Sequence, residues 1–197
     1  MRPPFALLAL LLAGAVCATA QPVYADDRAL SADQIRDLAR RELVWCENYR
    51  PTQKDCETLT LISLLPDGTL RETGVVRLAT TPDLKMVMDG RSSLQGNRVC
   101  SVFGDDTVKL GFLLNDQPIP EAAVGAIESA VREAMSEFDG KTLCQTFYRG
   151  SSDAEVRETI TVDGQRRTDL ESVYRLQPDE SGLDVRGPAP DAEESQV

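Results

Sequence analysis

The cysteines constrain the fold of this chain more than any other feature of its sequence. Five are present, and the first, Cys17, lies in an N-terminal segment typical of an export signal. Export would remove Cys17 and leave an even number of cysteines in an oxidising compartment. The sequence therefore predicts two disulfides, formed by Cys46, Cys56, Cys100 and Cys144.

Residues 1–25 contain the parts of an export signal. Arg2 provides the positive end, "FALLALLLAGAV" provides the apolar centre, and small residues follow it. The small-x-small rule allows cleavage after Ala20 or after Ala25, and we favour Ala25. The apolar run is shorter than the roughly 20 residues that cross a bilayer, and no later segment approaches that length. We therefore expect an exported protein, periplasmic or extracellular, without a membrane span.

The four remaining cysteines can pair in three ways, and the spacing favours one of them. Pairing neighbours, Cys46 with Cys56 and Cys100 with Cys144, closes the shortest loops. In the chain-entropy account of disulfides, the first would stabilise the fold by about 3 kcal/mol and the second by about 4 kcal/mol.

Charge and composition divide the exported chain into two parts. Residues 178–197 hold six acids, one base and three prolines, so they bury too little apolar surface to fold and should form an acidic disordered tail. Residues 26–177 have the length of a single domain. The whole chain has a net charge of −11, and both parts are acidic. Binding of nucleic acid or of an anionic membrane through bulk charge is therefore not expected.

Two segments have the periodicity of helices. The first begins with a capping box formed by Ser31 and Gln34, and its apolar spacing predicts a helix over residues 31–45. This would place Cys46 near a helix C-terminus. The second helix is predicted over residues 120–138, with Pro120 in its first turn and an apolar stripe at three- and four-residue steps.

The remaining segments alternate with a period of two residues, which is typical of strands. Asp-Gly turns predict hairpins over residues 57–80 and 155–177, and a further hairpin is predicted over residues 99–116. Residues 83–90 and 144–150 add single strands. Short turns join antiparallel neighbours, so the predicted class is α+β. We expect an antiparallel sheet of about six to eight strands, built from hairpins, packed on one face by two helices and linked by two disulfides.

The sequence contains no histidine, which excludes several kinds of chemistry. The commonest general base, the histidine-dependent nucleophiles and most zinc and copper sites all require it. The cysteines are separated by nine, 43 and 43 residues, which fits neither the close pairs of structural zinc sites nor the motif of thiol exchange. We therefore expect no metal and no cofactor, and no catalytic nucleophile can be named.

Pairs of carboxylates remain as candidates for acid–base chemistry. Acids lie close together in the sequence at Asp105 and Asp106, at Glu155 and Glu158, and at Asp179 and Glu180. Their spacing does not single out any pair. Asp105 and Asp106 fall in a predicted turn, where aspartate is favoured for local hydrogen bonding.

Candidates for recognition are easier to name. An aromatic residue and an arginine follow each predicted helix, and Lys54 lies in the loop that the first disulfide would hold. These residue types are enriched at binding hot spots. The candidate binding residues are Tyr49, Arg50, Lys54, Tyr148 and Arg149. The alternative to a binding surface is a structural role, in which Trp45 and Phe147 belong to the core and the arginines cover the edge of the core with their alkyl stems.

These observations favour, by elimination, a non-catalytic binding or accessory module. One alternative is a hydrolase or lyase that uses carboxylates and arginine, for which two acids should face each other in a concave pocket, one with a raised pKa. Another alternative is an inhibitor of an exported enzyme that presents the loop between Cys46 and Cys56. For a binding module, the sequence leaves open whether the partner is a protein or a small molecule.

Overall fold

The structure, a computed structural model, describes residues 28–104, 106–178 and 182–187. Its helices are α1 (Ala32–Arg40) and α2 (Glu121–Met135), with two short 3-10 helices, η1 (Ser136–Phe138) and η2 (Thr168–Leu170). No helix in these ranges is long and apolar enough to cross a membrane. The strands are β1 (Val44–Glu47), β2 (Asp55–Cys56), β3 (Thr58–Leu64), β4 (Leu70–Thr80), β5 (Asp83–Gln95), β6 (Arg98–Val102), β7 (Val108–Leu114), β8 (Gln117–Pro118), β9 (Thr142–Arg149), β10 (Glu155–Val162), β11 (Gln165–Arg166), β12 (Ser172–Gln177) and β13 (Asp184–Val185).

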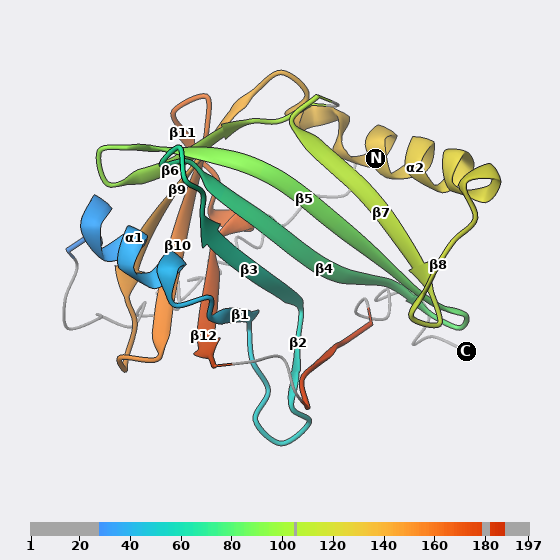
Figure 1. The fold of residues 1–197 in the computed structure, drawn as a ribbon, viewed down its shortest axis with the longest axis horizontal. Coiled ribbons are helices and arrows are strands. Elements are labelled where there is room, and N and C mark those ends of the chain that lie inside the picture. Colours follow the sequence, from blue (N-terminus) through green and yellow to red (C-terminus); the bar gives the residue numbers. More distant parts are fainter. Residues whose placement is uncertain (1–27, 105, 179–181, 188–197) are drawn as a thin grey trace, which may run out of the picture.

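Eight of the strands form a closed antiparallel barrel (Figure 1). In chain order they are β1, β3, β4, β5, β6, β9, β10 and β12, and each pairs with the next. Finally β12 pairs with β1 and closes the ring. This is an up-and-down barrel, in which each strand pairs with its neighbours in the chain order of the ring.

The long strand β5 belongs both to the barrel and to an extension of it. Its end at Ser93–Gln95 pairs with β6, whereas its first part, Leu84–Gly90, pairs with β7. Strands β4, β5, β7 and β8 therefore project beyond the ring, and α2 runs alongside β7 (Figure 1). The predicted hairpin over residues 99–116 is wrong, because β6 and β7 both run antiparallel to β5 and do not pair with each other. The turn between them redirects the chain without reversing it.

Helix α1 is shorter than predicted. The capping box is confirmed, since the side chains of Ser31 and Gln34 each accept from the backbone of the other. The helix ends at Arg40, however, and Glu42 adopts a positive φ of 48° before β1 begins. The prediction of helix up to residue 45 was wrong because Trp45 and its neighbours pair with two strands, β3 and β12. Cys46 therefore lies in a strand.

Alternation along the strands separates the interior of the barrel from its outer face. At one end of the barrel, Ile35 and Ala39 of α1 pack against inward-facing residues such as Trp45, Ile62 and Phe147. Helix α1 thus closes that end, which we call the floor. The antiparallel sheet, the two helices and the two disulfides were predicted correctly. Closure into a barrel was not predicted, and the helices do not share one face of a sheet.

Both disulfides have the predicted pairing, Cys46 with Cys56 and Cys100 with Cys144. The second joins residues that are directly opposite each other on β6 and β9. Their sequence neighbours Val99 and Gln145 face the interior, so this disulfide lies on the outer face of the barrel. It therefore links β6 and β9, the two ring neighbours that are joined by the longest connection.

Part of the predicted tail belongs to the domain. Strand β13 pairs in parallel with β2, and Val185 is only 2% exposed. Asp184 also forms an ion pair with Arg77 at 3.0 Å. Residues 182–187, which lie beyond the predicted boundary at residue 177, are therefore held against β2, with Val185 as a buried apolar anchor. The predicted export signal over residues 1–25 and the end of the predicted tail, residues 188–197, lie outside the described residues.

Candidate functional site

The interior of the barrel contains a cavity of about 360 Å³. Binding sites for small molecules measure about 300 to 1,000 Å³, so this volume suits a small ligand. The cavity extends from the floor to the opposite end of the barrel, where Phe103, Phe138 and Leu170 line it. We call this cavity the cup.

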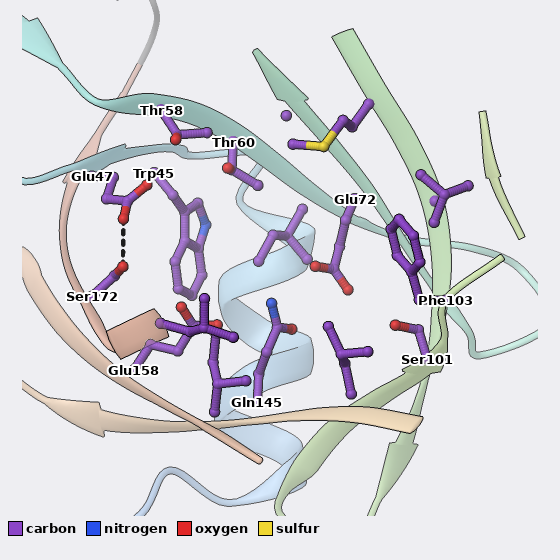
Figure 2. Close-up of a pocket in the computed structure, with 18 of the residues that line it drawn as sticks. Trp45, Glu47, Thr58, Thr60, Glu72, Ser101, Phe103, Gln145, Glu158 and Ser172 are labelled. Atoms are coloured by element: carbon purple, nitrogen blue, oxygen red, sulfur yellow. Dashed lines mark hydrogen bonds between the residues drawn. The ribbon is translucent and has the colours of Figure 1, made fainter. Parts of the chain in front are cut away.

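The wall of the cup has three layers, which follow from the inward positions of the strands. The floor and the opposite end are mostly apolar. Between them lies a polar belt to which several strands contribute (Figure 2). Its members are Glu47, Glu72, Ser101, Gln145, Glu158, Ser172 and Tyr174.

Glu158, on β10, is the most deeply buried acid of the belt, with an exposure of 1%. Burial raises the pKa of its carboxyl to about 8, and the charges of Glu72 and Glu47 act in the same direction. The Tyr174 hydroxyl donates to Oε2 at 3.0 Å and opposes this increase in part. Within the described part of the chain, Oε1 has no hydrogen-bond partner. At neutral pH the carboxyl is therefore mainly protonated.

Glu72 enters the belt from β4. Burial inside the barrel raises the pKa of its carboxyl, while Ser92 and Gln145 favour the charged form. The Ser92 hydroxyl donates to Glu72 Oε1. Gln145 lies between Glu72 and Glu158 (Figure 2) and lowers the pKa of both carboxyls. Two acids from different strands thus share one amide.

Glu47, on β1, completes a group of three acids. It accepts a hydrogen bond from the Ser172 hydroxyl on β12 (Figure 2). Its charge raises the pKa of both Glu158 and Tyr174. The three carboxyls are therefore electrostatically connected.

No basic side chain balances these acids inside the cup. Among the described residues that line the cavity, Arg91 is the one base, and its side chain is 71% exposed and lies 3.9 Å from Asp67. The described residues also contain no group of three or more acids and cysteines arranged to hold a metal ion. The cup is thus an acidic, uncompensated environment.

Trp45 forms part of the floor and carries a second unpaired polar atom. Its ring lies 5.2 Å from Phe147 and 5.8 Å from Tyr174, measured between centroids. Its indole nitrogen points towards the interior of the cup (Figure 2) and has no hydrogen-bond partner in the residues described. Trp45 and Phe147 are both buried, as the core alternative predicted. One buried donor and one buried acceptor therefore remain open in the same cavity.

The residues predicted for binding all lie outside the cup. Arg50 pairs with Asp55 through two contacts, Nε to Oδ1 at 2.7 Å and Nη2 to Oδ2 at 2.5 Å. Lys54 is exposed and adopts a positive φ of 55° in the loop before β2. Tyr49 lies in the same exposed loop. Arg50 and its neighbours hold the loop between Cys46 and Cys56.

The second predicted group lies on β9. The guanidinium of Arg157 stacks over the ring of Tyr148 at 4.7 Å, and Arg149 lies 3.6 Å from Asp153. Neither Tyr148 nor Arg149 lines the cup. A role for the predicted residues in binding a partner stays a prediction.

The sequence contained a signal for two of the three acids in the cup. Glu158 was named beside Glu155 as a candidate acid, but Glu72 was not. Both Glu158 and Glu72 follow Arg in an "RET" triplet, at a position where alternation would place an apolar residue: "LRETGVV" and "VRETITV". An acid at an inward position of a strand marks a polar interior. Glu47, Gln145 and Tyr174 carry no comparable signal.

Comparisons with protein-family models, with curated proteins and with solved structures give no match for this chain. The function must therefore be argued from the site.

Proposed function

We propose that this chain is a non-catalytic binding protein that holds one small organic molecule in the cup. The observation that carries this proposal is a cavity in a closed barrel with two unpaired buried polar atoms, Trp45 Nε1 and Glu158 Oε1. Eight-stranded barrels have an interior wide enough for one small ligand. The alternation of apolar and polar layers suits a molecule with an apolar body and a few polar groups.

The energetics support a ligand. An unpaired buried polar group costs roughly 1 to 3 kcal/mol, so the empty cup is less stable than one whose polar atoms are paired. A ligand that accepts from Trp45 and donates to Glu158 would recover this cost. The apolar layers would add the gain from burying its hydrocarbon part.

We place this activity outside the cytoplasm, in the periplasm or the extracellular space. The two disulfides support this location, because they persist in oxidising compartments. Binding there would serve capture, carriage or sensing of a molecule from the surroundings.

Tryptophan fluorescence offers a direct test, because Trp45 is the one tryptophan of the chain and lines the cup. Titration with a panel of small aromatic and alicyclic compounds should change its emission in a saturable way at one site per chain. Substitution of Gly74 by phenylalanine should abolish the change. A Cβ at Gly74 lies at ordinary contact distance, 3.6 Å from Met88 Cε, and the ring beyond it would occupy the cup.

Gly111→Phe is the matched control. Gly111 lies on β7 and does not line the cup, and a Cβ there comes no closer than 3.9 Å to other atoms. Its titration should match that of the unmodified protein. Equal loss of binding in both variants, or saturable binding that survives Gly74→Phe, would place the ligand elsewhere.

One observation favours a second candidate function, acid–base catalysis by a hydrolase or lyase. Glu72 and Glu158 line the same concave pocket, and the pKa of Glu158 is raised to about 8. These are the features that we set as the mark of a carboxylate enzyme. The arginine of that hypothesis is missing from the belt, since Arg91 is mainly exposed.

Mass spectrometry of bound compounds separates the two functions. The binding proposal expects each compound to be released unchanged after prolonged incubation. Conversion of a compound by the protein, lost in Glu158→Gln while binding persists, would establish the catalytic function instead.

A further inference from the structure

We propose that the ligand of the cup is a small organic cation, an amine or amidine on an apolar body, with its charged group among Glu47, Glu72 and Glu158. This inference rests on the proposed binding function and adds the chemical class of the ligand. It follows from the charges and the aromatic rings that surround the cavity, considered element by element.

The ionisable side chains that face the centre of the cup are acids. Strands β1, β4 and β10 contribute Glu47, Glu72 and Glu158, and β12 contributes the neutral Tyr174 hydroxyl. The other strands of the ring contribute no further acid to the described lining, and their one base, Arg91 on β5, is mainly exposed. An anionic ligand would meet three acids and no cation.

The acids are costly without a positive partner. Burial and mutual repulsion act on Glu158 together, so the protein alone stabilises its charged form poorly. A cation of the ligand would remove both penalties, and its N–H groups would pair with the open Oε1 of Glu158. A neutral ligand could pair with the open oxygen but would provide no counter-charge for the ionised form of Glu158.

The rings around the acids suit the same class. Trp45 and Phe147 at the floor and Tyr174 in the belt form a contiguous aromatic group, and Tyr174 donates to Glu158. Aromatic faces attract cations and also bury hydrocarbon. The open N–H of Trp45 would donate a hydrogen bond to a hydroxyl or carbonyl oxygen of the ligand.

Proton release should accompany binding. In the empty cup Glu158 is mainly protonated at neutral pH, and a bound cation favours its ionised form. Each molecule bound would then displace about one proton, and affinity should increase up to about tenfold for each pH unit between pH 6 and 8. A simple amine stays protonated over this range, so its own titration does not produce the effect.

The test uses sets of compounds matched in body and different in charge. Phenethylamine, phenethyl alcohol and phenylacetate form one set, and cyclohexyl and naphthyl analogues form two more. Binding is measured through Trp45 fluorescence and by calorimetry in two buffers of different ionisation enthalpy. We expect amines to bind at least about tenfold more tightly than the alcohols, carboxylates not to bind, and the amines to release protons.

Two variants locate the charge preference. Glu72→Gln and Glu158→Gln should each remove most of the advantage of the amine over the alcohol, measured as the ratio of the two affinities in the same variant, and circular dichroism is the control for folding. Glu133→Gln, which removes an exposed acid from α2, should leave this ratio unchanged. Alcohols or carboxylates that bind as tightly as amines would overturn the inference and leave the proposed function standing. If no compound of any charge binds in the cup, both the inference and the proposed function fail.

Discussion

The buried carboxyl of Glu158 should make this protein less stable as the pH rises from acid to weakly alkaline values. The pKa of Glu158 is 4.5 in its ordinary state and about 8 in the fold. The folded protein therefore holds a proton that the unfolded chain has lost. Stability from this group is complete below pH 4.5 and is lost as the pH rises through 8.

The magnitude follows from the width of that interval. Each pH unit within it removes about 1.4 kcal/mol from the free energy of unfolding, so Glu158 alone should account for about 4 kcal/mol between pH 5 and pH 8. Glu72 acts with the same sign, because burial raises its pKa too. The acids whose pKa is lowered, such as Asp55 and Asp89, act below this range. The absence of histidine removes the side chain that usually titrates here.

Glu158→Gln is the decisive variant, since glutamine can still accept from Tyr174 but cannot ionise. Urea unfolding at several pH values between 5 and 8, with the disulfides intact, measures the free energy of unfolding. The variant should resemble the unmodified protein at pH 5 and exceed its stability by about 4 kcal/mol at pH 8. The exposed-acid variant Glu133→Gln should follow the unmodified protein. Parallel pH profiles for Glu158→Gln and the unmodified protein would refute the assignment of a buried, protonated Glu158.

Three further perturbations test other parts of the structure. Replacing Cys100 and Cys144 by alanine together should lower the free energy of unfolding by about 4 kcal/mol in urea titrations, because the disulfide closes a loop of 44 residues; a change near zero would mean that the link adds nothing to β6 and β9. Deleting residues 188–197 should leave the thermal midpoint unchanged, whereas deleting residues 182–197 should lower it by removing Val185 and the ion pair of Asp184; equal midpoints would show that β13 does not dock. Arg50→Ala should leave fluorescence titrations of Trp45 unchanged, because Arg50 pairs with Asp55 outside the cup; weakened binding would connect that loop to the site.

Local signals in the sequence predicted much of this fold. The capping box, the Asp-Gly turns and the spacing of the cysteines each depend on neighbours in the chain, and all three were identified correctly. Helix α1 was extended too far because the apolar spacing up to Trp45 satisfies a helix as well as a strand. Pairing of β1 with both β3 and β12 decides between them, and that pairing is not local.

Closure of the sheet into a barrel could not be predicted from local signals, because it also depends on pairing between strands that are distant in the sequence. It depends on β12 pairing with β1 and on β6 pairing with both β5 and β9. The candidate site depended on closure in turn, because Glu47, Glu72 and Glu158 converge only when the ring is complete. The predicted aromatic and arginine pairs have the residue types of a binding surface, yet they lie on the outside. Inward-facing acids at apolar positions were the more informative signal.

Native mass spectrometry of the protein purified from its own cells tests the central claim most directly. We predict one small bound molecule per chain, positively charged in solution and released on unfolding, and we predict its absence from Gly74→Phe and its presence in Gly111→Phe. A chain that carries no small molecule from its own cells, and binds none when mixed with an extract of them, would contradict the assignment of the barrel interior as a binding site.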